Sequence, residues 1–236
     1  MKLYAVIPTH NRHDDLADLL DSIPPDVHVV VIDNASEPDV QFALPLRFLG
    51  RRIQVLRDEE QPPNLSRLWN LGLDWSERLH RLDDGTLPDE QPLEEYAVAI
   101  LNDDVVLPPV FLKLMAEELV KHNVDIAFPG GIGDRCWVNE HQPFPGVGLR
   151  MTGWCFVVRG SSGLRADESL RWWCGDDDLQ AQAVMNSRGT VRVGMFGHQA
   201  EGLRHKYPDE STIGVLREQT DADMATFVAK WGRRPW

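Results

Sequence analysis

Three consecutive polar residues, Asn102, Asp103 and Asp104, directly follow an apolar run and form the first group in this sequence that could do chemistry. Carboxylates at the end of a buried strand can bind a hard divalent cation such as Mg²⁺ or Mn²⁺, and that cation would bridge them to an anionic diphosphate. The alternative is an Asx turn that caps the helix predicted after Pro108, a common role for Asn and Asp. These residue types alone do not favour one interpretation over the other.

A second acidic cluster, Asp176, Asp177 and Asp178, opens a predicted helix after the aromatic pair Trp172 and Trp173. Acids at a helix N-terminus are stabilised by the helix dipole, so simple capping is one explanation. Three adjacent carboxylates also repel one another, which raises the pKa of one of them toward the range of a general base. We therefore predict one general base here, with the two tryptophans either offering a face to a sugar ring or packing in the core.

An imidazole near the end of the chain is the third candidate, and we prefer His205 to His198, which lies in the same stretch. A single histidine is more often structural, so its value depends on the carboxylates. Together with Asp104 and a donor diphosphate, His205 would complete the coordination of a divalent cation.

Composition and charge set the limits within which these groups act. The 236 residues, 42% of them hydrophobic, predict one domain with one substantial core. Lys and Arg number 24 against 37 Asp and Glu, which gives a net charge of -13. Such a surface repels nucleic-acid backbones and anionic lipids, and the sequence contains no Lys/Arg-rich run. An acidic protein that binds a phosphate-bearing substrate is therefore expected to use a cation.

The cysteines and the apolar segments indicate the compartment. Cys136, Cys155 and Cys174 stand far apart and form neither a C-x-x-C pair nor a zinc-type cluster, which fits a reducing environment. The first residues have no signal-peptide pattern, and no segment approaches ~20 consecutive apolar residues. We expect a cytoplasmic protein with no integral membrane segment.

Short apolar runs alternate with amphipathic segments, and this order predicts which residues converge. Strands are expected at residues 3–7, 27–32, 53–56, 96–101, 124–128, 152–158 and 191–196. Helices are expected at 16–23, from 65 onward, after Pro108, at 177–188 and around 224–231, and loops at 81–95 and 130–148. This is an α/β pattern with an open, mainly parallel sheet whose ligands bind beyond the carboxyl ends of the strands. The polar residues after the first, second and fourth strands should meet there.

Three motifs in this order resemble glycosyltransferase family 2, namely residues 5–12 ahead of a helix, residues 30–36, and residues 102–104. The resemblance covers about the first half of the chain well and the rest more loosely. It implies a Rossmann-like GT-A fold, a nucleoside-diphosphate sugar donor, a divalent metal at a D-x-D-type motif, and transfer with inversion. The single domain, residues 1–236, would then comprise a nucleotide-sugar-binding half (1–104) and an acceptor-binding and catalytic half (105–236).

By position, the resemblance also implies which residues contact the donor. Asp33 would read the base, and Asp103 would lie near the ribose or the metal. Trp69 stands where the family helix usually carries Arg, and Arg67, two residues earlier, would replace it. The donor-binding residues implied in this way are Pro8, Thr9, Asn11, Arg12, Asp33, Asn34, Ser66, Arg67, Asn70, Asn102 and Asp103.

The resemblance extends to the metal and to the base. Asp104 and His205 match the metal ligands. In residues 175–179 the family's acidic catalytic segment lacks its Glu, and the base is Asp176 when counted back from Leu179, or Asp177 when aligned on the preceding glycine. The residues that would line the acceptor side are Gly153, Trp154, Trp172 and Trp173.

The sequence therefore predicts a glycosyltransferase with Mn²⁺ or Mg²⁺ as cofactor. The acceptor stays open among glycan, protein, lipid and modified nucleic acid. One alternative is a nucleotidyltransferase, which would normally use a glycine-rich basic phosphate loop that residues 8–11 do not provide. The other is a sugar- or nucleotide-binding module that has lost activity.

Overall fold

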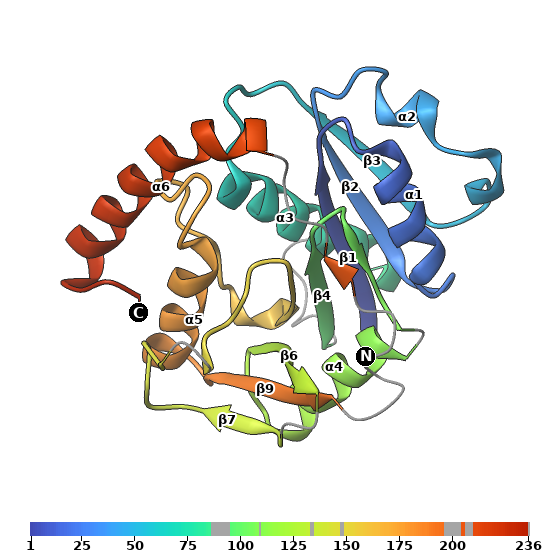
Figure 1. Ribbon diagram of the computed structural model, residues 1–236. Coiled ribbons are helices and arrows are strands. Elements are labelled where there is room, and N and C mark those ends of the chain that lie inside the picture. The colour runs from blue at the N-terminus through green and yellow to red at the C-terminus, as the bar shows by residue number, and fades with distance from the viewer. Residues whose placement is uncertain are drawn as a thin grey trace.

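The protein is an α/β structure in which helices cover both faces of a central sheet (Figure 1). A computed structural model describes residues 1–85, 95–108, 110–132, 135–146, 149–195, 204–205 and 210–235. The sheet has eight strands in the order β3-β2-β1-β4-β8-β6-β9-β7. Among the helices of these described residues, none combines the length and apolar character needed to cross a bilayer.

The first half of the chain forms the regular part of the sheet. Its four parallel strands are β1 (Lys2–Thr9), β2 (His28–Asn34), β3 (Ile53–Asp58) and β4 (Tyr96–Leu101). Their β-branched, buried residues suit a sheet that is covered on both faces. The connections contain α1 (His13–Ser22), α2 (Val40–Ala43), the 3₁₀ helix η1 (Leu46–Phe48) and α3 (Leu65–Asp84). This half follows the predicted alternation.

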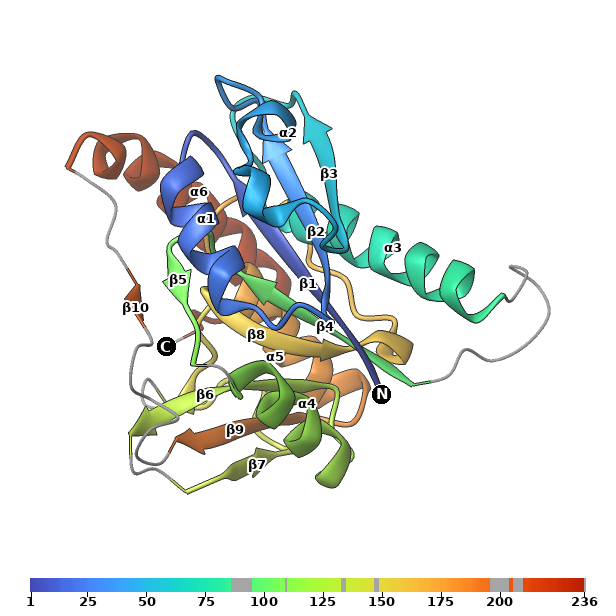
Figure 2. The same ribbon diagram turned by 90° about the vertical axis from the view of Figure 1, so that its right-hand side faces the viewer.

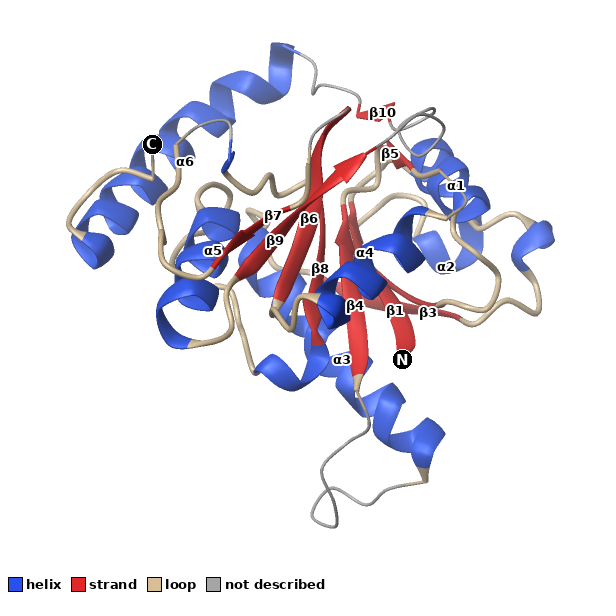
Figure 3. Ribbon diagram, turned by 90° about the horizontal axis from the view of Figure 1, so that it is seen from below, coloured by secondary structure: helices blue, strands red, loops and turns tan. Residues whose placement is uncertain are grey.

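Alternate residues of the central strands face two separate cores. Ala5 and Ile7 of β1 pack with α1 and with α4 (Phe111–Lys121), whereas Tyr4 and Val6 pack with α3 and with α5 (Gly175–Asn186). Gly72 allows α3 to approach β1 closely, because a Cβ at this position would lie 2.1 Å from Cγ1 of Val6. The two helical layers thus fix the sheet whose edge carries the polar residues (Figure 3).

The second half departs from the parallel pattern. The strand β8 (Cys155–Arg159) lies antiparallel between β4 and β6 (Ile126–Ile132), β9 (Thr190–Met195) is parallel to β6, and β7 (Trp137–Asn139) is antiparallel to β9. A separate two-stranded ribbon joins β5 (Val105–Val106) to β10 (Arg204–His205). The remaining elements are the 3₁₀ helix η3 (Gly160–Ser162) and the long α6 (Glu210–Trp231), which runs beside α5 (Figures 1 and 2).

Several boundaries differ from the sequence prediction. Residues 81–84, predicted as loop, belong to the last turn of α3, because Gly85 in a left-handed conformation ends the helix only after Asp84. The predicted loop at 130–148 contains β7, whose pairing with β9 is a tertiary contact that local composition does not reveal. The closing helix begins at Glu210, well before the apolar positions that predicted it.

Candidate active site

The carboxyl ends of β1 and β4 bring the first acidic cluster together with the loop after β1. Thr9 Oγ1 donates a hydrogen bond of 2.8 Å to Asp103 Oδ2. Arg12 Nη1 lies 3.2 Å from Asp104 Oδ2 and 3.8 Å from Asp103 Oδ1. The same guanidinium donates to Asp15 through Nε at 3.1 Å and Nη2 at 2.9 Å. One arginine is therefore shared by three carboxylates.

The two strand-end aspartates are buried without being caps. Asp103 is 8% and Asp104 6% exposed. Burial raises the pKa of Asp103 to about 6, against the opposing effects of the Thr9 hydroxyl and Arg12. The helix that follows, α4, has Val110 at its N-cap, so the capping role considered for Asn102, Asp103 and Asp104 is wrong. The side chains of Asp103 and Asp104 contact Thr9 and Arg12 instead.

The two predicted metal ligands, Asp104 and His205, come close along the backbone. In the ribbon of β5 and β10, the backbone of His205 pairs with Val105, the residue next to Asp104. Asp and His are both residue types that can ligate a divalent cation. Among the side chains that the structure describes, which do not include that of His205, no group of three His, Cys, Asp or Glu could hold a metal. His198 lies outside the described residues.

The polar residues after β2 are used inside the chain. Asp33 is fully buried, accepts hydrogen bonds from the amides of Ser36 (2.9 Å) and Val40 (3.0 Å), and pairs with Arg57 at 2.9 Å. Burial opposes its ionisation, but the hydrogen bonds and Arg57 outweigh this and hold the pKa of Asp33 below its ordinary value. Asn34 donates to Asp58 Oδ2 at 2.9 Å. Both side chains brace the edge formed by β2 and β3.

The loop after β1 is joined to the same edge. Pro8 is buried, and Asn11 has a left-handed φ of 55° and is exposed. The Asn11 amide donates to Ser36 Oγ at 2.9 Å, and its side-chain oxygen accepts from the amide of Glu37 at 2.7 Å. The motif residues predicted for donor binding at β1 and β2 therefore form one connected rim.

The donor-binding residues predicted on α3 make their contacts with the second half of the chain and with neighbouring acids. Ser66 Oγ donates to the carbonyl of Leu170 at 2.5 Å, and Asn70 exchanges two hydrogen bonds of 2.9 Å with the backbone of Ala166. Both are buried, so they attach α3 to the second half of the chain. Arg67 forms ion pairs with Asp58 and with Glu60. Of these three residues, Arg67 is the one with a partly exposed side chain.

The two acidic clusters occupy the same edge of the sheet. Leu101 pairs with Cys155, and the amide of Asn102 donates to the carbonyl of Trp154 at 2.9 Å. A Cβ added to Gly153 would lie 3.3 Å from Asp176 Oδ2. The backbone hydrogen bond between Asn102 and Trp154 thus connects the end of β4 to Gly153, the neighbour of Trp154. The absence of a side chain at Gly153 leaves room for the Asp176 carboxylate.

The three aspartates of α5 have three different environments. Asp177 is buried and forms a two-point ion pair with Arg150, with Nη2 at 2.6 Å from Oδ2. Asp178 is fully buried and accepts a hydrogen bond from Trp231 Nε1 at 2.8 Å, with Lys230 also at 2.8 Å. Asp176 remains partly exposed and accepts from backbone amides that include that of Gly153. Of the three, Asp176 is the carboxylate placed to receive a proton from outside.

The pKa values of the pair follow from burial and mutual repulsion. Burial raises the pKa of Asp176, and the nearby Arg150 charge and the backbone amides oppose this. Burial and the Asp176 charge raise the pKa of Asp177, with Arg150 again opposing. The like-charge effect expected from the sequence is present, and the bidentate arginine favours the negative charge on Asp177.

Of the residues predicted for the acceptor side, Gly153 lies next to Asp176. Gly153 and Trp154 precede β8, and both are partly exposed. Trp172 is partly buried, and Trp173 is 41% exposed, so Trp173 does not belong to the core. The backbone amides of both tryptophans bind Asp223 of α6, a residue that the sequence analysis did not single out. The sequence feature that could have indicated Asp223 is its position four residues before Phe227, on the same helix face as two aromatic residues. No comparable sequence feature indicated Arg150.

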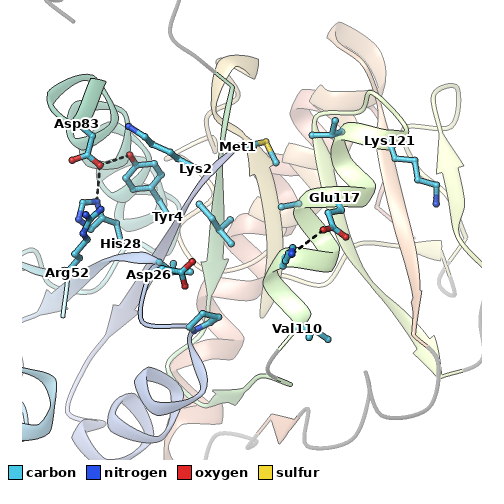
Figure 4. Close-up of a pocket in the computed structure, with 16 residues that line it drawn as sticks. Met1, Lys2, Tyr4, Asp26, His28, Arg52, Asp83, Val110, Glu117 and Lys121 are labelled. Carbon is cyan, nitrogen blue, oxygen red and sulfur yellow. Dashed lines mark hydrogen bonds and ion pairs between the residues drawn. The ribbon is translucent and has the colours of Figure 1, made fainter. Parts of the chain in front are cut away.

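A cavity of about 900 Å³ lies at the opposite end of the sheet, at the amino ends of β1 and β2 (Figure 4). There Asp83 accepts a 3.5 Å hydrogen bond from the Tyr4 hydroxyl and lies 3.5 Å from His28 Nδ1. Ligands of open α/β sheets bind at the carboxyl ends. This cavity is therefore distinct from the edge that carries the two acidic clusters.

Comparison with known proteins identifies the family of the chain. The sequence model of the family described as Glycosyl transferase family 2 matches residues 4–140. No curated protein sequence matches the chain.

Solved structures of S. aureus TarS share the GT-A fold. The TarS 1-349 structure is 16% identical with a TM-score of 0.59, over 94% of this chain and 65% of that one. Its complex with UDP is 15% identical, TM-score 0.58, over 95% and 65%. Its complex with UDP-GlcNAc is 16% identical, TM-score 0.55, over 94% and 66%. The chain spans 39% of the longer TarS chain, at 16% identity, TM-score 0.58 and 94% of its own length.

Proposed function

The chain belongs to glycosyl transferase family 2, and from this premise we propose that it transfers a sugar from a uridine-diphosphate sugar to an acceptor hydroxyl, with inversion at the anomeric carbon and with help from a divalent metal. The observation that carries the proposal is the junction of the two acidic clusters through Asn102, Trp154 and Gly153. We assign the cluster after β4 to the donor diphosphate and the cluster at the start of α5 to the acceptor. The uridine component is supported by the fold shared with a protein whose structures hold UDP and UDP-GlcNAc.

We assign the donor side to the rim formed by the β1 loop, the β2 end and the β4 end. Asp103 and Asp104 would face the ribose and the diphosphate. Arg12, which already lies between these carboxylates, can turn toward a phosphate oxygen when a cation takes over their charge. Asp104 and His205 would hold Mg²⁺ or Mn²⁺, which stabilises the negative charge of the departing diphosphate.

We assign the general base to Asp176. Its carboxylate would take the proton of the acceptor hydroxyl while the hydroxyl oxygen forms a bond to the anomeric carbon. The bond from that carbon to the diphosphate oxygen breaks on the opposite face, and the electron pair leaves with the nucleoside diphosphate. A raised pKa brings Asp176 closer to the operating pH, which favours this proton transfer. Arg150 engages the neighbouring Asp177 in a two-point ion pair, so that carboxylate is already occupied by a side chain of the protein.

Trp173 is the exposed aromatic side chain beside the base and would offer its face to the acceptor. Glycan, lipid, protein and modified nucleic acid acceptors all present hydroxyl groups that this arrangement can accept. The net charge of -13 favours an acceptor that is not itself strongly anionic.

A donor panel tests the proposal. The full chain is incubated with UDP-, GDP- and dTDP-sugars, with Mn²⁺ and with EDTA, and the released nucleoside diphosphate and sugar are measured separately. We expect UDP release with at least one UDP-sugar, dependent on Mn²⁺. Release of pyrophosphate would indicate nucleotidyl transfer instead, and donor binding with no release under any condition would indicate a binding module.

A further inference from the structure

The helix α6 holds the segment that leads to the proposed base. Asp223 is buried, 1% exposed, and its two carboxylate oxygens accept hydrogen bonds from three successive backbone amides. The distances are 3.1 Å to the nitrogen of Arg171 and 2.7 Å each to those of Trp172 and Trp173. A fourth hydrogen bond, 2.7 Å from Gln219 Nε2, fixes the Asp223 side chain from its own helix.

The anchored segment determines where α5 begins. Cys174 follows it directly, has a left-handed φ of 64° and occupies the N-cap of α5. A non-glycine residue in this conformation persists only where the surroundings enforce it. The two residues after Cys174 bring the chain to Asp176, so the three hydrogen bonds to Asp223 define the entry angle of the helix turn that carries the base.

The other flank of Asp176 is also attached to α6. Lys230 and Trp231 bind Asp178, and Lys230 in addition pairs with Asp167 at 2.7 Å. Between these two attachments Phe227 packs, fully buried, on Leu170 and Cys174. The three contacts lie at positions 223, 227 and 231 of α6, which are on one helix face. This face therefore holds the turn 174–178 from both sides.

We propose that Asp223 is a positioning residue that sets the orientation of Asp176 and Trp173 toward the acceptor, so that α6 supports catalysis without touching the substrate. The inference rests on the proposed function, because it takes Asp176 as the base. Asp223 suits this role better than a neutral residue, since a carboxylate offers acceptor sites to several amides at once. An Asn at this position has a single acceptor oxygen and would turn an NH₂ group toward at least one of the amides.

The test compares Asp223→Asn with Asp221→Asn. Asp221 lies two residues away on the exposed side of the same helix. This control therefore makes the same chemical change at a residue that does not bind the amides of residues 171–173. We expect kcat for transfer to fall by about 10- to 100-fold in Asp223→Asn, as displacement of a catalytic group by about 1 Å does. The KM for the donor should stay within about twofold, because the donor rim is untouched. The acidic limb of the pH profile of kcat should shift in Asp223→Asn. The control Asp221→Asn should behave as wild type.

Amide hydrogen exchange of residues 171–178 gives a readout that does not need activity. We expect faster exchange in this segment for Asp223→Asn and no change for Asp221→Asn. If Asp223→Asn fails to fold, Asp223→Glu takes its place, because it keeps the charge and displaces it by one methylene. An unchanged kcat and pH profile in a variant with faster exchange would overturn the inference. A wild-type chain that transfers no sugar would instead defeat the proposed function, and unchanged exchange in the variant would then defeat this inference independently.

Discussion

The two acidic clusters consist of the same residue type, but their positively charged partners differ. One arginine is shared by the first cluster, whereas the aspartates of the second cluster have different partners. At the end of β4, one guanidinium, that of Arg12, serves Asp15, Asp103 and Asp104 together. Within this group of four side chains, negative charge exceeds positive charge, which favours the arrival of a further cation. This excess of negative charge is the reason for proposing a metal ion at this cluster.

At the start of α5, the counter-charges are separate. Arg150 pairs directly with Asp177, and Lys230 and Trp231 bind Asp178, while Asp176 has the more distant Arg150 charge and backbone amides. The pKa values of Asp176 and Asp177 are both raised, and of the three aspartates Asp176 is the partly exposed one, which is why we propose it as the general base. The comparison shows that the partner of an aspartate, more than the aspartate itself, decides its chemistry.

Removal of the base is expected to have the largest effect. Asp176→Asn keeps the shape of the side chain but cannot accept the acceptor proton, so we expect kcat to fall by about 10³-fold. The donor KM should stay near that of wild type. The matched variant is Asp177→Asn, which should lose stability because it weakens the pair with Arg150, and should keep more activity. A larger loss of kcat in Asp177→Asn would exchange the roles of the two residues.

The first cluster is tested by Asp104→Asn. Loss of one ligand charge should weaken Mn²⁺ binding by about 10- to 100-fold, so that activity returns only at higher Mn²⁺ concentration. The measurement is UDP release against Mn²⁺ concentration, with Mn²⁺ binding followed separately by electron paramagnetic resonance. Equal Mn²⁺ affinity in the variant and the wild type would show that this cluster does not hold the metal.

A smaller effect of opposite sign is expected at Arg12. Arg12→Gln removes a positive charge within 4 Å of both Asp103 and Asp104, so Mn²⁺ without donor should bind about threefold to tenfold more tightly. Arg47→Gln is the control, because Arg47 pairs with Asp21 in an exposed position. Weaker Mn²⁺ binding in Arg12→Gln would mean that Arg12 supports the metal site and does not compete with the cation.

The sequence predicted the donor half well because its signals are local. Each strand there ends in a polar motif, as in residues 102–104, and parallel strands bring their carboxyl ends to one edge without any knowledge of side-chain contacts. The four parallel strands were predicted from this alternation, whereas their order was not. Local signals were therefore sufficient to place Thr9, Arg12, Asp103 and Asp104 together.

The same analysis could not resolve the acceptor half, because the groups that differentiate its acids are distant in sequence. Arg150 reaches Asp177 over 27 residues, and Trp231 reaches Asp178 over 53. The antiparallel insertion of β8 between β4 and β6 brings Gly153 next to Asp176. No local pattern encodes these contacts, and for this reason the sequence left Asp176 and Asp177 as alternatives for the base.

The smallest expected effect concerns the stability cost of the base. Because burial raises the pKa of Asp176, the folded protein binds the Asp176 proton more readily than the unfolded chain does. The contribution of this residue to stability is therefore full below its unfolded pKa, about 3.8, and is lost as the pH rises through the raised folded value. Asp176→Asn does not ionise and escapes this loss. Its Tm should exceed that of wild type at pH 8, and the difference should shrink toward zero near pH 4. Thermal unfolding of both proteins across this range, with Asp221→Asn as the control, measures the difference, and a Tm gain that did not depend on pH would assign it to packing and not to the buried charge.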